Sequence, residues 1–235
     1  MANSTFDLTG KTALVTGGNG GIGLGMAKAL AQSGADICIW GQNEEKNKTA
    51  AEKIAAYGGQ VAAFKCNVSD ENQVEENFAR TVEALGKVDT CFANAGVGSM
   101  GTPFHNMDIS EWRNVFGVNM EGVFFTFRSA IRHMLEREDG GSLVVTSSLS
   151  AKYGMPRGEH YAATKAGVVA IVRGLAVEYA RYRIRANAIL PGWIETDMTA
   201  PLFNIEKFEK NVIPRIPQRR WGIPADFGPI AVYFA

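Results

Sequence analysis

The sequence predicts an α/β fold, a doubly wound parallel sheet with helices on both faces. Short apolar runs alternate with longer amphipathic stretches along the whole chain, which is the pattern of repeated strand–helix units. The 235 residues, 46% of them hydrophobic, suffice for one large core. Because no internal repeat, low-complexity tract or linker interrupts this pattern, we expect residues 1–235 to form a single domain.

Six apolar segments are the strand candidates. Each is short, and most are rich in β-branched or aromatic residues, as strands buried on both faces usually are. The segments span residues 12–16, 36–40, 60–65, 90–93, 142–147 and 184–189.

Helices are expected between these strands, and several carry signals for their ends. The first is predicted over 21–32 with Gly34 ending it, and the second over 43–57 with Asn43 as its cap. Asp70 and Gln73 suit a capping box for a third helix, which ends near residue 86. Ser110 is expected to cap a fourth, long helix. Apolar residues cover much of that helix, so we expect it to be buried, with another subunit as one possible cover.

Charge and cysteine usage exclude several classes of partner. The 24 basic residues balance 24 acidic ones without a basic block, which argues against nucleic acid or a membrane surface. Three cysteines without metal-ligand spacing are expected to be buried free thiols, and no metal site is predicted. The N-terminus lacks a leader pattern and no apolar run reaches membrane-spanning length. We therefore expect a cytoplasmic protein that acts on a small molecule.

A glycine-rich loop near the N-terminus predicts a nucleotide site. Thr16 and Gly17 follow the first strand, and Gly21, Ile22 and Gly23 open the first helix. Backbone N–H groups and the positive end of the helix therefore converge where a pyrophosphate could lie, and glycines leave room for it. The spacing is G-x-x-x-G-x-G rather than the general G-x-G-x-x-G fingerprint, but the strand–turn–helix context predicts a Rossmann-type fold.

A second group of residues predicts acid–base chemistry. Tyr161 and Lys165 stand four residues apart, which places them on one face of a helix. A tyrosine with a pKa of about 10 is a poor acid or base at neutral pH, and a nearby ammonium is expected to lower that pKa. Ser148 ends the fifth predicted strand, at the edge of the sheet where open α/β folds bind ligands. Alone, the pair would more often be an exposed aromatic beside a solvated charge; Ser148 favours a catalytic site.

In order and spacing, the chain resembles the short-chain dehydrogenases/reductases. The resemblance covers nearly the whole sequence and is carried by the glycine loop, Asn94-Ala95-Gly96, Asn119, Ser148, Tyr161, Lys165 and Pro191-Gly192. It implies an NAD(P)(H)-dependent oxidoreductase that interconverts a secondary alcohol and a ketone by hydride transfer. The catalytic residues it implies are Asn119, Ser148, Tyr161 and Lys165. The expected nucleotide contacts are Thr16, Gly17, Asn19, Gly21, Ile22, Gly23, Gln42, Asn67, Val68, Asn94, Ala95, Gly96, Tyr161, Lys165, Pro191, Gly192, Ile194 and Thr196.

The same resemblance implies a role for each polar residue. Ser148 and Tyr161 would donate hydrogen bonds to the carbonyl oxygen, and Lys165 would lower the tyrosine pKa and hold the nicotinamide ribose. Asn119 would hold a water that links Lys165 to solvent; the alternative is an amide bonded to neighbouring backbone. Ser147 could also be the exposed serine, but the family spacing selects Ser148.

The choice between NAD and NADP depends on the end of the second strand. An acid there would accept a hydrogen bond from the ribose 2′-OH of NAD, but the chain has Gln42. An arginine that would favour NADP is also missing, and Asn19 stands at the other expected position. Because no acid repels a 2′-phosphate, and Lys46 and Lys48 follow in the next helix, we favour NADP(H) and leave dual use open. Asn67 replaces the aspartate usual near the adenine but keeps an acceptor.

Residues 191–224 combine prolines, aromatics and arginines with weak periodicity, and we expect them to form a substrate loop or lid. The pocket walls are expected from Tyr153, Met155, the loop 97–104, Trp193, Met198 and Phe203. His160 is expected at the rim of the site or at an interface.

The family resemblance raises three further expectations. We expect a homotetramer or homodimer, and because related chains continue into one more strand, we expect that C-terminal strand to be absent here. A reductase acting on a carrier protein would need a basic docking patch, for which Arg128 and Arg132 are candidates, although acids at 136–139 weaken it. Two other functions stay open: a sugar or polyol dehydrogenase working oxidatively, and a dinucleotide-sensing module without turnover.

Overall fold

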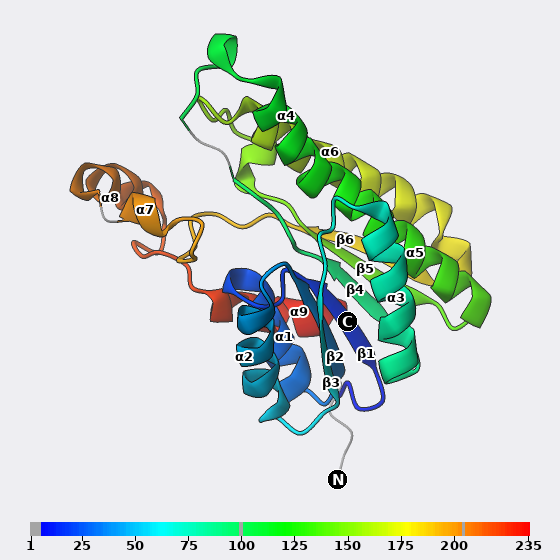
Figure 1. Ribbon diagram of the computed structural model, residues 1–235. Helices are drawn as coiled ribbons and strands as arrows, with labels where there is room; N and C mark the ends of the chain where they lie inside the picture. The colour runs from blue at the N-terminus through cyan, green and yellow to red at the C-terminus, as the bar shows by residue number, and fades with distance from the viewer. Residues whose placement is uncertain (1–5, 99–100, 204) are drawn as a thin grey trace.

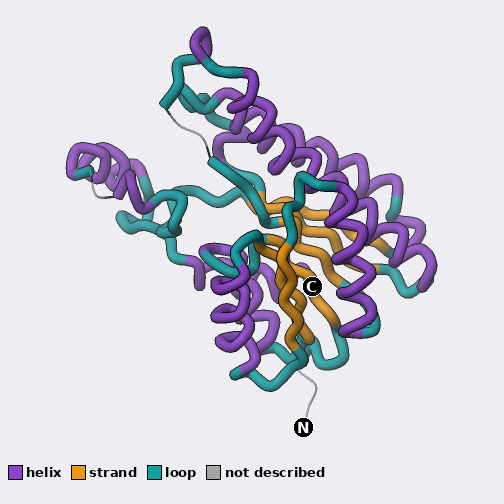
Figure 2. Tube along the Cα trace, in the orientation of Figure 1, coloured by secondary structure: helices purple, strands orange, loops and turns teal. Residues whose placement is uncertain are grey.

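A computed structural model describes residues 6–98, 101–203 and 205–235, and it contains one parallel sheet (Figure 2). Every strand pair is parallel, and the order across the sheet is β3-β2-β1-β4-β5-β6. The predicted strands are therefore confirmed, with ends that differ by at most one residue. The strands are β1 (Thr12–Thr16), β2 (Asp36–Gly41), β3 (Val61–Lys65), β4 (Thr90–Ala93), β5 (Gly141–Thr146) and β6 (Ile184–Ile189).

The strand order creates a crevice between β1 and β4. The chain builds outward from β1 to β3 on one side and then returns to add β4, β5 and β6 on the other. Connections from β1 and β4 consequently leave in opposite directions, and their carboxyl ends separate. Ligands of open α/β sheets bind at such a reversal of strand order.

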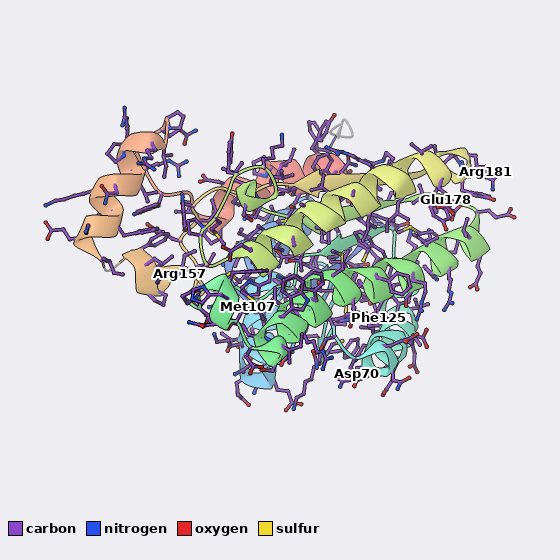
Figure 3. The ribbon with its side chains drawn as sticks, turned by 90° about the horizontal axis from the view of Figure 1, so that it is seen from above. Asp70, Met107, Phe125, Arg157, Glu178 and Arg181 are labelled. Carbon is purple, nitrogen blue, oxygen red and sulfur yellow. The ribbon has the colours of Figure 1, made fainter. Side chains whose placement is uncertain are left out.

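Helices cover both faces of the sheet (Figure 1). One face carries α1 (Gly21–Gln32), α2 (Glu44–Ala55) and α9 (Gly228–Phe234). The other carries α3 (Glu71–Leu85), α4 (Ile109–Phe116), α5 (Gly122–Arg137) and α6 (Glu159–Glu178). Seen from above, α5 and α6 run side by side, with Met107 and Arg157 at one end and Glu178 and Arg181 at the other (Figure 3).

The predicted helix ends are largely confirmed. The Asn43 side chain accepts a hydrogen bond from the Lys46 N–H, and Gly34 adopts a φ of +98° after α1. Asp70 caps α3 by accepting from the Gln73 N–H at 3.2 Å. The return half of the expected capping box is different, because the Gln73 amide donates to the Asp70 carboxylate and accepts from the Asn67 N–H.

The fourth helix begins and continues differently from the prediction. Asp108, not Ser110, is its cap: the Asp108 carboxylate accepts a hydrogen bond from the Ser110 N–H at 2.7 Å. The helix is then interrupted by a π-helical turn, Gly117–Glu121, which separates α4 from α5 and contains Asn119. Such turns are often found at functional sites. Phe124 is 49% exposed, so α5 is not buried on all sides within this chain.

After β6 the chain forms a projecting segment that contains α7 (Ala200–Phe203) and α8 (Glu206–Val212) and stands away from the sheet (Figure 1). Its core is aromatic: Phe203 stacks on Trp221 at a ring separation of 4.3 Å, and Trp193 meets Phe208 edge-on at 5.0 Å. A bridge between Ile194 and Gly222 closes its base. The segment therefore packs mainly against itself.

Candidate active site

Three polar side chains join the carboxyl ends of β1, β4 and β5. The Thr16 hydroxyl accepts hydrogen bonds from the backbone N–H groups of Asn94 and Ala95, both at 3.0 Å. The Asn94 amide donates to the Thr16 carbonyl at 3.1 Å and accepts from the Thr146 hydroxyl at 3.0 Å. Thr16 and Asn94 thus shape the floor of the crevice by bonding to the protein itself.

The glycine loop is folded closely onto this floor. Gly17 has a φ of +64°, a conformation that a side chain would strain. A Cβ on Gly23 would overlap the Gly17 carbonyl oxygen and the Asn94 amide, so only glycine fits there. Gly20 precedes α1 without a side-chain cap, which leaves N–H groups of the first turn facing the crevice. These residues fit a dinucleotide, because no side chain of the loop blocks the approach of a pyrophosphate to the N–H groups of the first turn.

A second group of amides closes the adjacent end of β2. The Asn19 amide donates to Asn47 at 2.6 Å, and Asn47 in turn donates to the Gly41 and Phe64 carbonyls. Sequence reasoning missed Asn47, although a buried polar residue among the helix positions that face the sheet is the signal that could have found it. Asn19 is consequently held in place.

Gln42 and Asn67 lie together beyond β2 and β3. The Gln42 amide donates to the Asn67 side-chain oxygen at 3.3 Å, and the same oxygen accepts from the N–H and hydroxyl of Ser69. The neighbouring Val68 is buried against Gly122. The acceptor expected of Asn67 is therefore engaged within the protein.

Tyr161 and Lys165 lie on the first turns of α6, at the crevice. The Lys165 ammonium is 5.6 Å from the centre of the Tyr161 ring and donates a hydrogen bond to the Thr146 carbonyl at 2.8 Å. Ser148 lies beside Tyr161, and its side chain favours a lower pKa of the tyrosine. The Ser147 hydroxyl instead donates to the Lys165 carbonyl at 2.7 Å, so Ser148 is the serine that faces the tyrosine.

The expected lowering of the Tyr161 pKa by Lys165 is wrong, because the pKa is raised and Lys165 is not among the causes of the shift. Burial disfavours the phenolate and raises the pKa, and the Ser148 side chain only partly opposes this. Burial also lowers the pKa of Lys165, to about 8, because its ammonium has lost water. Because Lys165 loses its proton near pH 8, it is no longer charged at the higher pH at which the Tyr161 phenol would ionise.

Asn119 is satisfied by the backbone of the loop after β4. Its side-chain oxygen accepts from the Val97 N–H at 2.8 Å, and its amide donates to the Val97 carbonyl at 2.9 Å. This is the alternative that the sequence left open. A Cβ on Gly96 would lie 3.2 Å from the Asn119 oxygen and 3.4 Å from the Lys165 ammonium, so this loop approaches both residues closely.

His160 is not at a rim. It has no exposed surface and lies between α6 and α4, stacked near Trp112, with its Nε2 3.5 Å from a Glu111 oxygen. It precedes Tyr161 directly in the chain but lies on a different side of α6, because successive helical residues diverge by about 100°.

Two adjoining cavities meet at Ser148 and Tyr161. One, of about 290 Å³, is lined by the glycine loop, Gly96, Lys165, Ile194 and Thr196, which were predicted for the nucleotide. The other, of about 650 Å³, opens toward the projecting segment. Both share Pro191 and Gly192 as walls. A larger hollow of about 850 Å³ lies elsewhere, between α1 and α9, and contains none of the predicted catalytic residues.

The lining of the 650 Å³ cavity agrees only partly with the predicted walls. Tyr153, Met155, Trp193 and Met198 are present as expected. Phe203 is absent from the lining, since its ring stacks on Trp221 within the projecting segment. From the loop 97–104 only Gly98 contributes among described positions; Ser99 and Met100 lie outside the described residues. Leu149 was not predicted, and Thr199, Leu202 and Arg215 were predicted only as part of the lid 191–224; they come together through the packing of the segment.

The described positions contain no group of three or more potential metal ligands. None of the helices that they form has the length and apolar character needed to span a bilayer.

Comparison with known proteins identifies the family. A family model described as enoyl-(acyl carrier protein) reductase matches residues 17–235. The chain is 36% identical to a 3-oxoacyl-[acyl-carrier-protein] reductase of Chlamydia pneumoniae, over 97% of this chain and 90% of that protein. It is 34% identical to a 5-keto-D-gluconate 5-reductase of Escherichia coli, over 99% and 91%. A gluconate 5-dehydrogenase of Burkholderia cenocepacia in complex with NADP and tartrate has a similar structure, with a TM-score of 0.93 at 31% identity, covering 100% and 91%.

The chain therefore belongs to the short-chain dehydrogenases/reductases. It is an oxidoreductase of hydroxyl and keto groups that uses NAD(P).

Proposed function

We propose that this enzyme interconverts a secondary alcohol and a ketone, with Tyr161 as the general acid/base and Ser148 and Lys165 as its partners. The observation that carries the proposal is that Ser148 and Tyr161 both line the two cavities, at the place where the cavities meet. A substrate carbonyl placed there can accept from both hydroxyls. The nicotinamide coenzyme supplies or accepts the hydride.

The residues act on the oxygen of the substrate. As a ketone is reduced, negative charge develops on this oxygen, and donors already in position stabilise the transition state selectively. Tyr161 then gives up its proton. Because burial raises its pKa, the phenol is protonated at neutral pH, which is the state needed for reduction. In the oxidative direction the phenolate must form, so we expect oxidation to be favoured by higher pH.

Asn119 and Lys165 support this centre in the proposal. Asn119 holds the loop after β4 through Val97, and whether it also holds a water next to Lys165 stays a prediction. The remaining predicted nucleotide contacts, among them Thr196, are part of the same proposal.

The proposal can be tested by replacing Tyr161 with phenylalanine and following the oxidation of reduced nicotinamide with a panel of ketones. Loss of the hydroxyl should lower kcat by about 10²–10⁴-fold, the usual range for general acid–base catalysis, and leave coenzyme binding intact. The matched control is Tyr182→Phe, the same change in an exposed tyrosine after the far end of α6. Unchanged turnover in Tyr161→Phe would refute the mechanism. Coenzyme binding without turnover on any ketone, in the unmodified enzyme, would favour the dinucleotide-sensing alternative.

For the substrate we propose a ketone that carries a carboxylate, with residues 191–224 as its lid. Arg215 is the charged residue among the described residues that line the 650 Å³ cavity, and no partner is observed for its guanidinium in that part of the chain. A keto-gluconate reductase and a tartrate-bound gluconate dehydrogenase among the relatives support an acidic substrate. An oxidative sugar dehydrogenase is the alternative, and the neutral-sugar enzyme L-rhamnose 1-dehydrogenase is also similar to this chain.

A carrier protein is less well supported as the substrate. Arg128 forms ion pairs with Glu71 and Glu75, and Arg132 pairs with Glu75. The predicted basic docking patch is thus largely neutralised by acids of α3.

We further propose that residues 1–235 act as one domain within a homodimer or homotetramer. The exposed Phe124 on α5 supports a subunit contact there. Light scattering after size-exclusion chromatography tests it, and a monomer at all concentrations would contradict it.

A further inference from the structure

One ion pair crosses the mouth of the nucleotide cavity. The Lys46 ammonium, from the first turn of α2, lies 2.7 Å from a carboxylate oxygen of Asp197, which follows β6 at the base of the projecting segment. Both residues line the 290 Å³ cavity together with Asn19 and Gly20. Residues 151 positions apart in the chain are thus joined across the entrance for the coenzyme.

The end of β2 contains no fixed charge that would choose between coenzymes. Gln42 is neutral, and its amide is already bonded to Asn67. An acid at this place would favour NAD by accepting from the ribose 2′-OH and by repelling a 2′-phosphate. Lys46 lies only a few residues after the end of β2. Among the described residues, it is the cation that this end of β2 and the start of α2 contribute to the cavity lining.

The ion pair is exposed, which allows its partners to change. The Lys46 side chain is 57% exposed and that of Asp197 is 88% exposed. Ion pairs in water contribute little, because solvent screens them and two long side chains must be held still. A phosphate monoester carries a charge near −2 at neutral pH and offers three strong acceptor oxygens, so it can displace a single carboxylate.

We propose that Lys46 exchanges Asp197 for the 2′-phosphate when NADP(H) binds, so that this pair selects NADP(H) over NAD(H). With NAD(H) the ion pair to the lid segment persists. With NADP(H) the Asp197 carboxylate is released, which links the choice of coenzyme to the base of the lid. The inference rests on the nucleotide site of the proposed function but not on the Tyr161 chemistry.

Lys48 provides the matched control. It lies on the same helix, two residues further on, and is also exposed, but it lines a different hollow with Glu44, Lys65 and Arg80. Lys46 and Lys48 were equivalent in the sequence, and the structure separates them. Replacing either with glutamine removes the same charge from α2.

The experiment measures equilibrium binding of NADP⁺ and NAD⁺ by calorimetry, without substrate, to the full chain and four variants. The variants are Lys46→Gln, Lys48→Gln, Asp197→Asn and the double variant Lys46→Gln/Asp197→Asn. Lys46→Gln should weaken NADP⁺ about 10-fold and NAD⁺ less than about 2-fold, since only one coenzyme offers the charge-assisted bond. Lys48→Gln should change neither by more than about 2-fold.

Asp197→Asn should tighten NADP⁺ by about 3-fold, because Lys46 no longer has a competing partner, and this gain should vanish in the double variant. Equal weakening of both coenzymes by Lys46→Gln would place Lys46 on the pyrophosphate and overturn the proposal. So would an equal effect of Lys48→Gln, or a gain from Asp197→Asn that persists without Lys46. If Lys46→Gln does not fold, Lys46→Arg should keep the preference for NADP⁺, and its loss would overturn the proposal. Because binding is measured without turnover, failure of the proposed catalysis cannot be mistaken for failure here.

Discussion

Across the crevice, two walls of the candidate active site are built differently. On the sheet side, the polar atoms of Thr16 and Asn94 form hydrogen bonds within the protein, and a Cβ on Gly23 would overlap backbone atoms. On the lid side, half-buried aromatic rings stack on one another and Arg215 has no observed partner among the described residues. The polar side chains of the first wall are bonded within the protein, whereas the second wall has a charged side chain available to a ligand. Substitutions should therefore cost stability on the sheet side and change specificity on the lid side.

The largest expected effect comes from a single methyl group in the glycine loop. Gly23→Ala should destabilise the protein by about 3 kcal/mol or more and abolish measurable coenzyme binding, because overpacking against backbone cannot be relieved by a rotamer change. Gly174→Ala on α6 is the control, since a Cβ there has nothing within 4 Å and Gly174 does not line the nucleotide cavity. Thermal unfolding and coenzyme titration measure both effects. If the two alanines behave alike, the sheet-side wall is not as tightly packed as the structure indicates.

The difference between the walls also explains what the sequence could predict. Strands, glycines and caps such as Asn43 are set by local backbone requirements, so their signals lie within a few residues of each other. Ser148, Tyr161 and Lys165 could be placed because sheet edge and helical spacing bring them together. The π-helical turn at Gly117–Glu121 could not, because residues of ordinary helix propensity form it under tertiary packing.

The lid side was predicted only in part, for a related reason. Phe203 and Arg215 are both half-exposed or exposed residues in a segment of weak periodicity, and only long-range packing decides which one faces the cavity. The direction of the Tyr161 pKa also depended on burial, which spacing alone does not show.

Lys165 lies between the two walls, and its titration should make the stability of the protein depend on pH. Its pKa is about 8 in the folded protein against an ordinary value near 10.5. Between these values the unfolded chain binds a proton that the folded protein does not, so stability rises with pH in this window. Relative to Lys165→Met, which cannot titrate, the wild type should gain on the order of 2 kcal/mol from pH 8 to 10.5.

Below pH 8 the lysine is charged in both states, and the difference between wild type and Lys165→Met should be constant. Denaturant unfolding of the two proteins from pH 7 to 10.5, without coenzyme, measures the difference directly. A constant difference over the whole range would mean that Lys165 keeps an ordinary pKa and that water reaches its ammonium. The Lys165 ammonium would then keep its charge to higher pH and could lower the pKa of Tyr161.

The smallest effect is expected on the lid side. Arg215→Gln should raise KM about 10-fold for a ketone with a carboxylate, because one charge-assisted hydrogen bond at an exposed site is lost. It should leave KM for a neutral ketone, kcat and the unfolding temperature nearly unchanged. Lys207→Gln is the control, since it removes one positive charge from α8 outside the cavity. Kinetics with an acidic and a neutral ketone of similar size separate recognition of the carboxylate from general attraction. Equal KM changes for both ketones, or for both variants, would show that Arg215 does not bind the carboxylate. The lid would then be an aromatic cover without a preference for acidic substrates.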